Sequence, residues 1–281
     1  MKKKLKIIIL LVIISILLIG FTIKQNNDIT ITYLKYIDYY VPEDFQSYKI
    51  LHVSDLHNKR FGRKQSKLLE KVEFINPDII LVTGDLIDSR HTNLKIAMDF
   101  VKGAIKIAPT YYVPGNHESR IKNYPDISYR LSSQGVNVLE NDYAVLEKHS
   151  SQLALMGLLD PDFSHEEDYN YIDKNLESLT KDNERRFTIL LSHRPELIDL
   201  YAKYQVNLVF AGHAHGGQIR LPFIGGLIAP DQGLFPKYTE GMYKMEKTAM
   251  VVSRGLGNSI FPIRLFNKPE LVVIELGKPK G

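Results

Sequence analysis

The chain has 281 residues, of which 44% are hydrophobic and 24% are charged, and its formal net charge at pH 7 is +4. These proportions are those of a globular protein and exclude a wholly disordered chain. The chain contains no cysteine. This excludes disulfides, thiol nucleophiles and thiolate metal sites, so any metal ion must be held by His, Asp, Glu, Asn or backbone oxygen.

The excess of positive charge lies at the amino terminus. Four of the first six residues are lysine, and no acidic residue precedes Asp28. Without these four lysines the 36 basic residues fall to 32 and equal the 32 acidic residues. The remaining chain is therefore formally neutral, which argues against nucleic acid as a partner.

An apolar run over residues 7–23 follows the lysines and is interrupted only by Ser15, Gly20 and Thr22. At about 1.5 Å per residue, a helix of this length reaches roughly 25 Å, close to the thickness of a thin hydrocarbon core. We expect residues 1–27 to form an uncleaved membrane anchor with a basic flank. One alternative is a cleaved signal peptide, although the run ends without an Ala-x-Ala-like site. The other is a buried helix of a soluble protein, although the run has no polar face.

The lysines before the run also predict an orientation. The positive-inside rule keeps the amino terminus in the cytoplasm. The protein is then a single-pass protein of the cell membrane whose large domain is extracytoplasmic. We expect residues 28–47 to be a linker or leading strand, and residues 48–276 to be the main domain.

Apolar strands and amphipathic helices alternate along the main domain. Apolar runs predict strands over residues 49–54, 78–83, 110–113, 136–139, 143–147, 152–157, 187–192, 206–211, 248–253 and 270–276. Helical spacing predicts helices over residues 64–76, 92–107, 171–181 and 196–204. This order predicts an α/β fold of two stacked mixed β-sheets flanked by helices.

Metal-capable side chains directly follow five of these strands. The sets are Asp55-Leu-His57, Gly84-Asp85-Leu-Ile-Asp88, Gly115-Asn116-His117-Glu118, Ser192-His193 and Gly212-His213-Ala214-His215. Each set alone is also typical of a turn or of a satisfied hydrogen bond. Because ligand sites in α/β folds gather at the carboxyl ends of strands, five such sets predict one shared site. Carboxylate, amide oxygen and imidazole suit Mn, Zn or Fe, and one carboxylate can serve two ions.

The ordered set of motifs resembles the calcineurin-like metallophosphoesterases over about residues 48–276. The stretch Gly-His-Ala-His-Gly-Gly-Gln-Ile-Arg-Leu-Pro at 212–222, with Ser-Arg-Gly-Leu-Gly-Asn at 253–258 and Asn-Lys-Pro-Glu at 267–270, resembles the bacterial membrane-associated branch. That branch includes YkuE- and YaeI-type phosphodiesterases and is similar to some UDP-2,3-diacylglucosamine hydrolases. The resemblance implies a four-layer sandwich and a hydrolase of phosphoester bonds with two divalent metal ions per chain.

The resemblance also implies a role for each motif residue. Asp55, His57 and His215 would hold the first ion, and Asp85 would bridge both. Asn116, His193 and His213 would hold the second ion. A metal-bridging hydroxide would attack phosphorus in line, and His117, which holds no metal, would protonate the departing oxygen. Asp88 would orient a ligand histidine.

The substrate is less constrained than the metal centre. A membrane anchor favours a lipid-linked or cell-envelope phosphoester, hydrolysed as a monoester or a diester. The alternatives are a UDP-2,3-diacylglucosamine-type pyrophosphate hydrolase, a nuclease and a non-catalytic metal-binding module. The apolar, glycine-rich segment over residues 221–229 suits either a contact with acyl chains or a buried lining. Arg220 and Arg254 suit either a substrate phosphate or a structural role, and the oligomeric state is left open.

Overall fold

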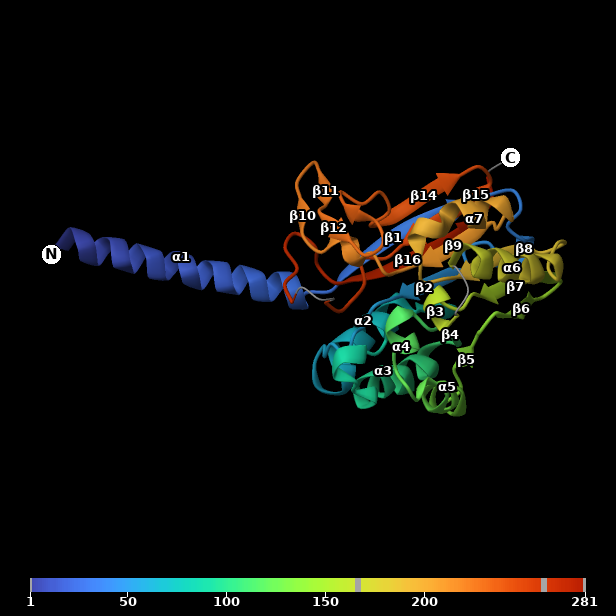
Figure 1. Ribbon diagram of the computed structural model, residues 1–281, viewed down its shortest axis with the longest axis horizontal. Helices are drawn as coiled ribbons and strands as arrows, with labels where there is room; N and C mark the ends of the chain where they lie inside the picture. The colour runs from blue at the N-terminus through green and yellow to red at the C-terminus, as the bar shows by residue number, and fades with distance from the viewer. Residues whose placement is uncertain (1, 165–167, 259–261, 280–281) are drawn as a thin grey trace.

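The computed structural model describes residues 2–164, 168–258 and 262–279. These residues form an α/β body from which one long helix, α1 (Lys2–Asn27), projects (Figure 1). The body contains two six-stranded sheets with helices on their outer faces. The α/β class with two stacked mixed sheets is therefore confirmed.

The first sheet has the order β1-β16-β2-β3-β4-β5. Its strands are β1 (Thr30–Ile37), β16 (Glu270–Gly277), β2 (Lys49–Val53), β3 (Ile79–Thr83), β4 (Thr110–Val113) and β5 (Asn137–Val138). β2 to β5 run parallel, β16 is antiparallel to β2, and β1 pairs with β16 in parallel. The carboxyl ends of β2, β3 and β4 therefore meet at one edge of this sheet.

The second sheet has the order β14-β15-β9-β8-β7-β6. Its strands are β14 (Gly241–Met245), β15 (Thr248–Val252), β9 (Leu208–Ala211), β8 (Phe187–Leu191), β7 (Ser151–Gly157) and β6 (Asp142–Lys148). β15, β9, β8 and β7 are parallel, and the two outer strands are antiparallel to their neighbours. The carboxyl ends of β8 and β9 form the second half of the same edge.

Helices cover the outer face of each sheet. The helices are α2 (Ser66–Ile75), α3 (Leu94–Ile107), α4 (Asn116–Ser119), α5 (Tyr124–Ser133), α6 (Asp168–Lys181) and α7 (Ile198–Lys203). Buried side chains of α2, α3 and α5 pack with the first sheet, and those of α6 and α7 pack with the second. A third cluster joins the facing sides of the two sheets, for example Ile50 and Ile79 with Leu153 and Ile189.

Local sequence explains these elements directly. All five residues of β3 are buried, as expected for a parallel strand covered on both faces. In α3, Ile96, Phe100, Val101 and Ala104 are buried on one stripe. α2 ends at Ile75, and the next residue, Asn76, has a φ of 49°, the left-handed conformation that commonly caps a helix end.

Short turns and hairpins complete the chain. The 3₁₀ turns are η1 (Glu43–Phe45), η2 (Arg63–Gln65), η3 (Ser89–His91), η4 (Pro161–Phe163), η5 (Pro195–Leu197) and η6 (His215–Gly217). Two small hairpins follow η6, namely β10 (Arg220–Leu221) with β11 (Gly225–Gly226), and β12 (Ile228–Ala229) with β13 (Gly233–Leu234). The sequence patterns did not predict these hairpins, α5 or β14. The helix expected over 196–204 is shorter, because η5 takes its first turn.

α1 is long and apolar enough to cross a membrane over Lys3–Asn27, and it is the only such helix among the described residues. Its most apolar window has no buried residues, so the alternative of a buried soluble helix is wrong. The end of α1 is fixed to the body. Asn26 Nδ2 donates to the carbonyl oxygen of Arg264 at 3.2 Å, and the Arg264 N–H donates to Asn26 Oδ1 at 3.0 Å. The rings of Phe21 and Phe266 also pack against each other, with 5.6 Å between their centroids.

Candidate metal centre

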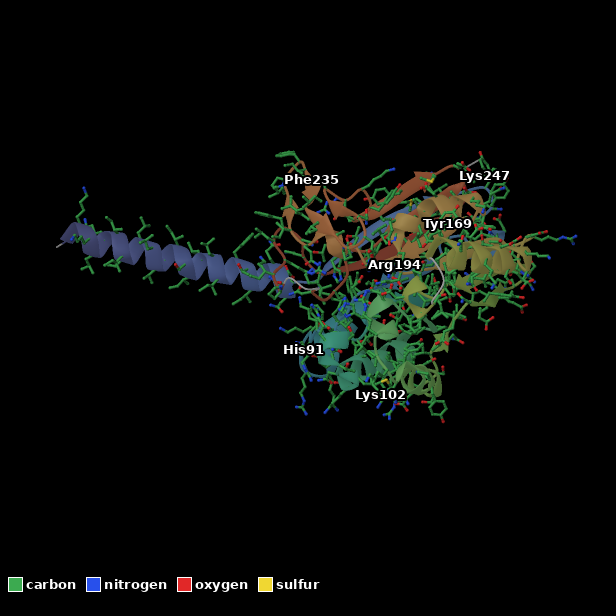
Figure 2. All side chains as sticks on the ribbon, viewed as in Figure 1. His91, Lys102, Tyr169, Arg194, Phe235 and Lys247 are labelled. Atoms are coloured by element: carbon green, nitrogen blue, oxygen red, sulfur yellow. The ribbon has the colours of Figure 1, made fainter. Side chains whose placement is uncertain are left out.

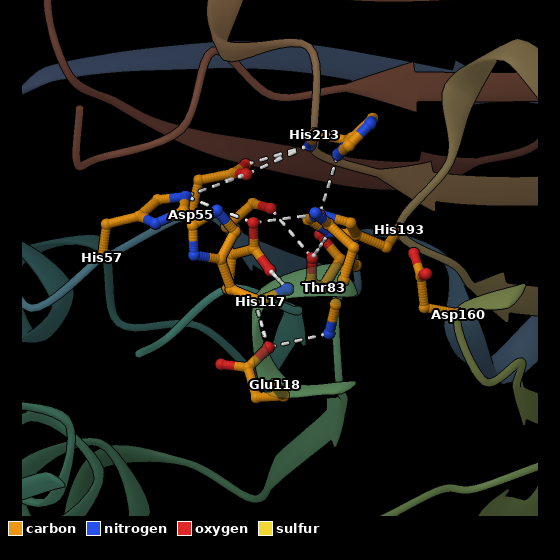
Figure 3. Close-up of polar contacts among 12 residues, drawn as sticks. Asp55, His57, Thr83, His117, Glu118, Asp160, His193 and His213 are labelled. Atoms are coloured by element: carbon orange, nitrogen blue, oxygen red, sulfur yellow. Dashed lines mark hydrogen bonds and ion pairs between the residues drawn. The ribbon is translucent and has the colours of Figure 1, made fainter. Parts of the chain in front are cut away.

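Five strand ends from two sheets converge on one buried cluster of polar side chains (Figure 3). The loops after β2, β3 and β4 carry Asp55, His57, Asp85, Asn116 and His117, and those after β8 and β9 carry His193, His213 and His215. All eight side chains are buried. The structure therefore brings together every site residue that the sequence predicted.

The first group of donors comprises Asp55, His57, Asp85 and His215, whose ligand atoms all lie within 4.8 Å of one another. His57 Nε2 lies 3.2 Å from Asp85 Oδ2 and 3.8 Å from Asp55 Oδ1. His215 Nε2 lies 3.4 Å from Asp55 Oδ1. Metal–ligand bonds of about 2.0–2.2 Å separate neighbouring ligand atoms by roughly 3 to 3.6 Å. Most of these spacings fall in that range.

The second group comprises Asp85, Asn116, His193 and His213. His193 Nε2 lies 3.3 Å from Asp85 Oδ2, 3.2 Å from Asn116 Oδ1 and 3.2 Å from His213 Nδ1. Oδ2 of Asp85 thus lies near His57 of the first group and His193 of the second. One carboxylate oxygen is therefore placed between two sets of donors.

The orientation of Asn116 tests whether this group fits a cation. Its amide oxygen faces only imidazole nitrogens, at 3.2 Å from His193 Nε2 and 3.1 Å from His213 Nδ1, and its NH₂ group faces the guanidinium of Arg120. With neutral imidazoles and no cation, the opposite amide orientation would satisfy all four groups better. With a cation between the oxygen and the imidazoles, the observed orientation is the favourable one. The donors therefore fit a bound cation.

His57 gives a second test. Its Nε2 is buried and makes no hydrogen bond within the described residues, although two carboxylates lie near it. A buried polar atom without a hydrogen bond usually costs about 1–3 kcal/mol. Nε2 of His57, which lies near the carboxylate oxygens of Asp55 and Asp85, therefore fits the role of a metal ligand.

The backbone is strained at the same residues. Asp55, His57, Asp85, His213 and His215 all have a positive φ, between 44° and 65°. Residues other than glycine rarely adopt this region, and such strain is typical of functional sites. The chain thus turns sharply after β2, β3 and β9, where these five side chains are directed at one site.

The comparisons with known proteins agree with this geometry. Residues 48–217 match the family model described as calcineurin-like phosphoesterase. The chain is 32% identical to the uncharacterized metallophosphoesterase YkuE of Bacillus subtilis, over 84% of this chain and 81% of that protein. This chain belongs to the calcineurin-like phosphoesterase family.

A second relative carries an activity in its name. This chain is 28% identical to the phosphodiesterase YaeI of Escherichia coli, with 82% of each chain covered. Its fold is similar to that of TT1561 from Thermus thermophilus, with a TM-score of 0.51 at 14% identity over 75% of this chain and 90% of that one. The family uses a dinuclear metal centre, and its members hydrolyse phosphoester bonds.

The histidines of the site fall into two groups, those whose pKa is raised and those whose pKa is lowered. Burial is the largest single effect and opposes the charged imidazole, but the carboxylates of Asp85 and Asp55 together outweigh it. They raise the pKa of His57 to about 9 and that of His193 to about 10. Burial dominates at His215 and lowers its pKa well below the usual value. Burial also lowers the pKa of His117 to about 4.

His117 lies beside the donors with its tautomer set by the backbone. The Ser89 N–H donates to Nδ1 of His117 at 3.1 Å. The neutral imidazole therefore carries its proton on Nε2. Asp88, expected to orient a ligand histidine, instead lies 3.6 Å from Nδ1 of His117, and its carboxylate binds the guanidinium of Arg90. Asp88 therefore lies beside His117, the expected proton donor.

Asp231 and Arg194, which the sequence patterns did not predict as site residues, contact the second group of donors. Nε2 of His213 lies 2.7 Å from Asp231 Oδ2, on the turn between β12 and β13. Arg194 contacts Asp231 and binds the buried carboxylate of Asp160 through two nitrogens, at 2.7 and 2.9 Å. No sequence signal links residue 231 to the motifs, because it follows an apolar segment without a strand-end pattern.

Glu118 and two arginines have structural partners. The Glu118 carboxylate accepts hydrogen bonds from the N–H groups of Asp85 and Gly115 at 2.8 Å and of Ile87 at 2.9 Å. It thereby ties the loop after β3 to the loop after β4. Arg254 donates to Glu270 at 2.9 Å, and Arg220 donates to the Gly216 carbonyl at 3.0 Å. Both guanidinium groups are therefore engaged within the protein.

Proposed function

We propose that the chain is a dinuclear-metal-dependent phosphodiesterase or phosphatase, with its domain over residues 48–276. The proposed ligands of the first cation are Asp55, His57 and His215. Those of the second are Asn116, His193 and His213, and Asp85 serves both. The single observation that carries this proposal is the position of Asp85 Oδ2, 3.2 Å from His57 Nε2 and 3.3 Å from His193 Nε2.

When bound, two divalent ions, Mn, Zn or Fe, would supply Lewis-acid activation of water and of the phosphoryl group. The protein positions their ligands through hydrogen bonds to the remaining atoms. Nδ1 of His193 donates to the Thr83 carbonyl at 2.7 Å, which leaves Nε2 directed at the second group. The His213 N–H lies 3.2 Å from both oxygens of Asp55, which links the two groups.

His117 is the proposed general acid. Its neutral form holds a proton on Nε2, since Ser89 donates to the other ring nitrogen. Its ring lies 4.5 Å from the ring of His57, centroid to centroid, at the rim of the first group. From there Nε2–H would protonate the oxygen that leaves phosphorus, a role typically worth 10²–10⁴ in rate.

We propose that the substrate is lipid-linked or part of the cell envelope, and that it reaches the site at the membrane surface. This proposal is supported by α1, whose end is hydrogen-bonded to the domain that carries the metal-capable residues. Residues 1–27 would cross the cell membrane once, and the lysines at the amino terminus would keep the catalytic domain outside. The phosphodiesterase name of a relative supports a diester substrate.

Metal analysis of the purified full chain tests the dinuclear centre. We expect about two divalent ions per chain, with hydrolysis of bis(p-nitrophenyl) phosphate that a chelator removes and added metal restores. Asp85→Ala should lose most of both ions, because both groups lose a donor. Asp99→Ala, on α3 and outside the site, is the matched control. A full metal complement in Asp85→Ala would contradict the shared ligand.

A substrate panel tests the chemical class. Diesters, monoesters and a nucleotide-linked lipid would be compared with the metal-loaded protein in detergent. Preference for a lipid diester is the expected result. Hydrolysis confined to a nucleotide diphosphate lipid would instead identify a pyrophosphate hydrolase.

A further inference from the structure

The two hairpins β10–β11 and β12–β13 present uncovered apolar side chains at the end of the body from which α1 leaves (Figures 1 and 2). Phe223 is fully exposed, and Leu234 and Phe235 are 72% and 66% exposed. Ile224 and Phe266 are also exposed. We call these five residues the apolar tips. Phe223, Ile224 and Phe266 line one open cleft. Exposed apolar groups gathered in this way mark an interaction surface.

The charged side chains of the hairpins are paired within the protein. Between residues 219 and 236, Arg220 and Asp231 are the only charged residues. Arg220 contacts Glu240 and the Gly216 carbonyl, and Asp231 contacts Arg194 and His213. Arg220 lines the cleft next to Phe223, and the side chain of Asp231 is 52% exposed, but both charges have partners. The hairpins therefore carry no unpaired charge.

The tips lie at the level where α1 would leave a bilayer. Phe21 belongs to the apolar run of α1, and its ring packs on that of Phe266. Phe266 in turn lines an open cleft of about 500 Å³ whose other walls include Phe223 and Ile224. Contacts thus connect the last apolar turns of α1 to the tip of β10–β11. If α1 spans a membrane, these rings lie at its surface.

A basic loop contacts the end of α1 as well. Lys59 donates to the Asn26 carbonyl. The residues that follow it include the exposed Arg60, Arg63, Lys64 and Lys67, with no acidic residue up to position 69. Basic side chains beside an apolar surface complement anionic lipid headgroups. The charge of this loop therefore favours a bilayer over a neutral protein partner.

We propose that the apolar tips are a second membrane contact, inserted into the leaflet from which α1 emerges. This inference rests on the proposed anchoring role of α1. Partial insertion of such a surface typically reaches about 5–10 Å, into the boundary of headgroups and acyl chains. Asp231 lies on the inserted hairpin β12–β13 and contacts His213. The contact therefore holds the metal centre close to the headgroups.

Tryptophan fluorescence tests this surface, because the natural chain contains no tryptophan. Phe223→Trp and Phe235→Trp would each be reconstituted as the full chain in vesicles of phosphatidylcholine and phosphatidylglycerol, with and without brominated acyl chains. We expect a blue-shifted emission that the bromines quench by about twofold. Tyr129→Trp, exposed on α5 and away from α1, is the matched control and should be neither shifted nor quenched.

A tryptophan inside α1 separates this inference from the proposed anchor. Ile16→Trp should be quenched if α1 crosses the bilayer. Quenching at 16 but at neither 223 nor 235 would overturn the second contact and leave the anchor. Quenching at none of the three would overturn both. A blue shift at 223 without quenching would identify a protein cover, such as a second copy, and would also overturn the proposal.

Discussion

Asp231 Oδ2 lies 2.7 Å from Nε2 of His213, although the two residues belong to different loops. His213 follows a central strand of the second sheet, and Asp231 sits on the turn of a surface hairpin. A carboxylate in this position holds the imidazole so that Nδ1 faces the other donors. The hairpin β12–β13, which carries Leu234 of the apolar tips, thus contacts the metal centre through this hydrogen bond.

Asp231→Asn tests this positioning. Loss of such a carboxylate typically costs about 10–100-fold in metal affinity, and we expect that loss for one of the two ions. The metal content would be titrated by calorimetry. Asp162→Asn is the matched control, because Asp162 also binds Arg194, at 2.8 Å, but contacts none of the proposed metal ligands. Equal affinities in the two variants would contradict the role of Asp231.

His117→Asn tests the proposed general acid. The variant should keep its metal ions and lose about 10²–10⁴ in turnover on a diester with a poor leaving group. The loss should be much smaller for p-nitrophenolate, which leaves without a proton. The exposed His91 provides the control His91→Asn. A uniform loss for both leaving groups would argue against proton donation.

Metal binding should release protons. Nearby carboxylates raise the pKa of His57 to about 9 and that of His193 to about 10, so both imidazoles are protonated at pH 7 before a cation binds. A cation must displace these protons, and its apparent affinity therefore rises with pH from 7 and levels off near 10. Calorimetry in two buffers of different ionisation heat measures the release. A binding heat that is the same in both buffers would contradict it.

Glu118→Ala tests the tie between the loops after β3 and β4. The change leaves three buried N–H groups without an acceptor, and we expect a loss of about 3 kcal/mol or more in the free energy of unfolding. Thermal unfolding should show a Tm lower by about 6 °C or more. Glu70→Ala, at an exposed site on α2, should leave Tm unchanged. A stable Glu118→Ala protein would show that water satisfies these groups.

The metal-capable residues were predictable from the chain alone because each directly follows an apolar strand. Asp85 after β3 and His213 after β9 are examples. Strand identity depends on local apolar runs, and parallel strands bring their carboxyl ends to a common edge. The apolar run over residues 7–23 likewise predicted an anchor over residues 1–27, where the structure has α1 (Lys2–Asn27).

Tertiary structure alone decided what lies around those residues. Asp231 reaches His213 only because a hairpin folds back across the strand ends, and no periodicity records that path. The segment 221–229 was equally compatible with a buried lining and an exposed surface, and packing left Phe223 exposed beside the end of α1. Short-range patterns specify strands and their ends. The partners of those ends depend on contacts between residues far apart in the chain, which the amino-acid order encodes only through the completed fold.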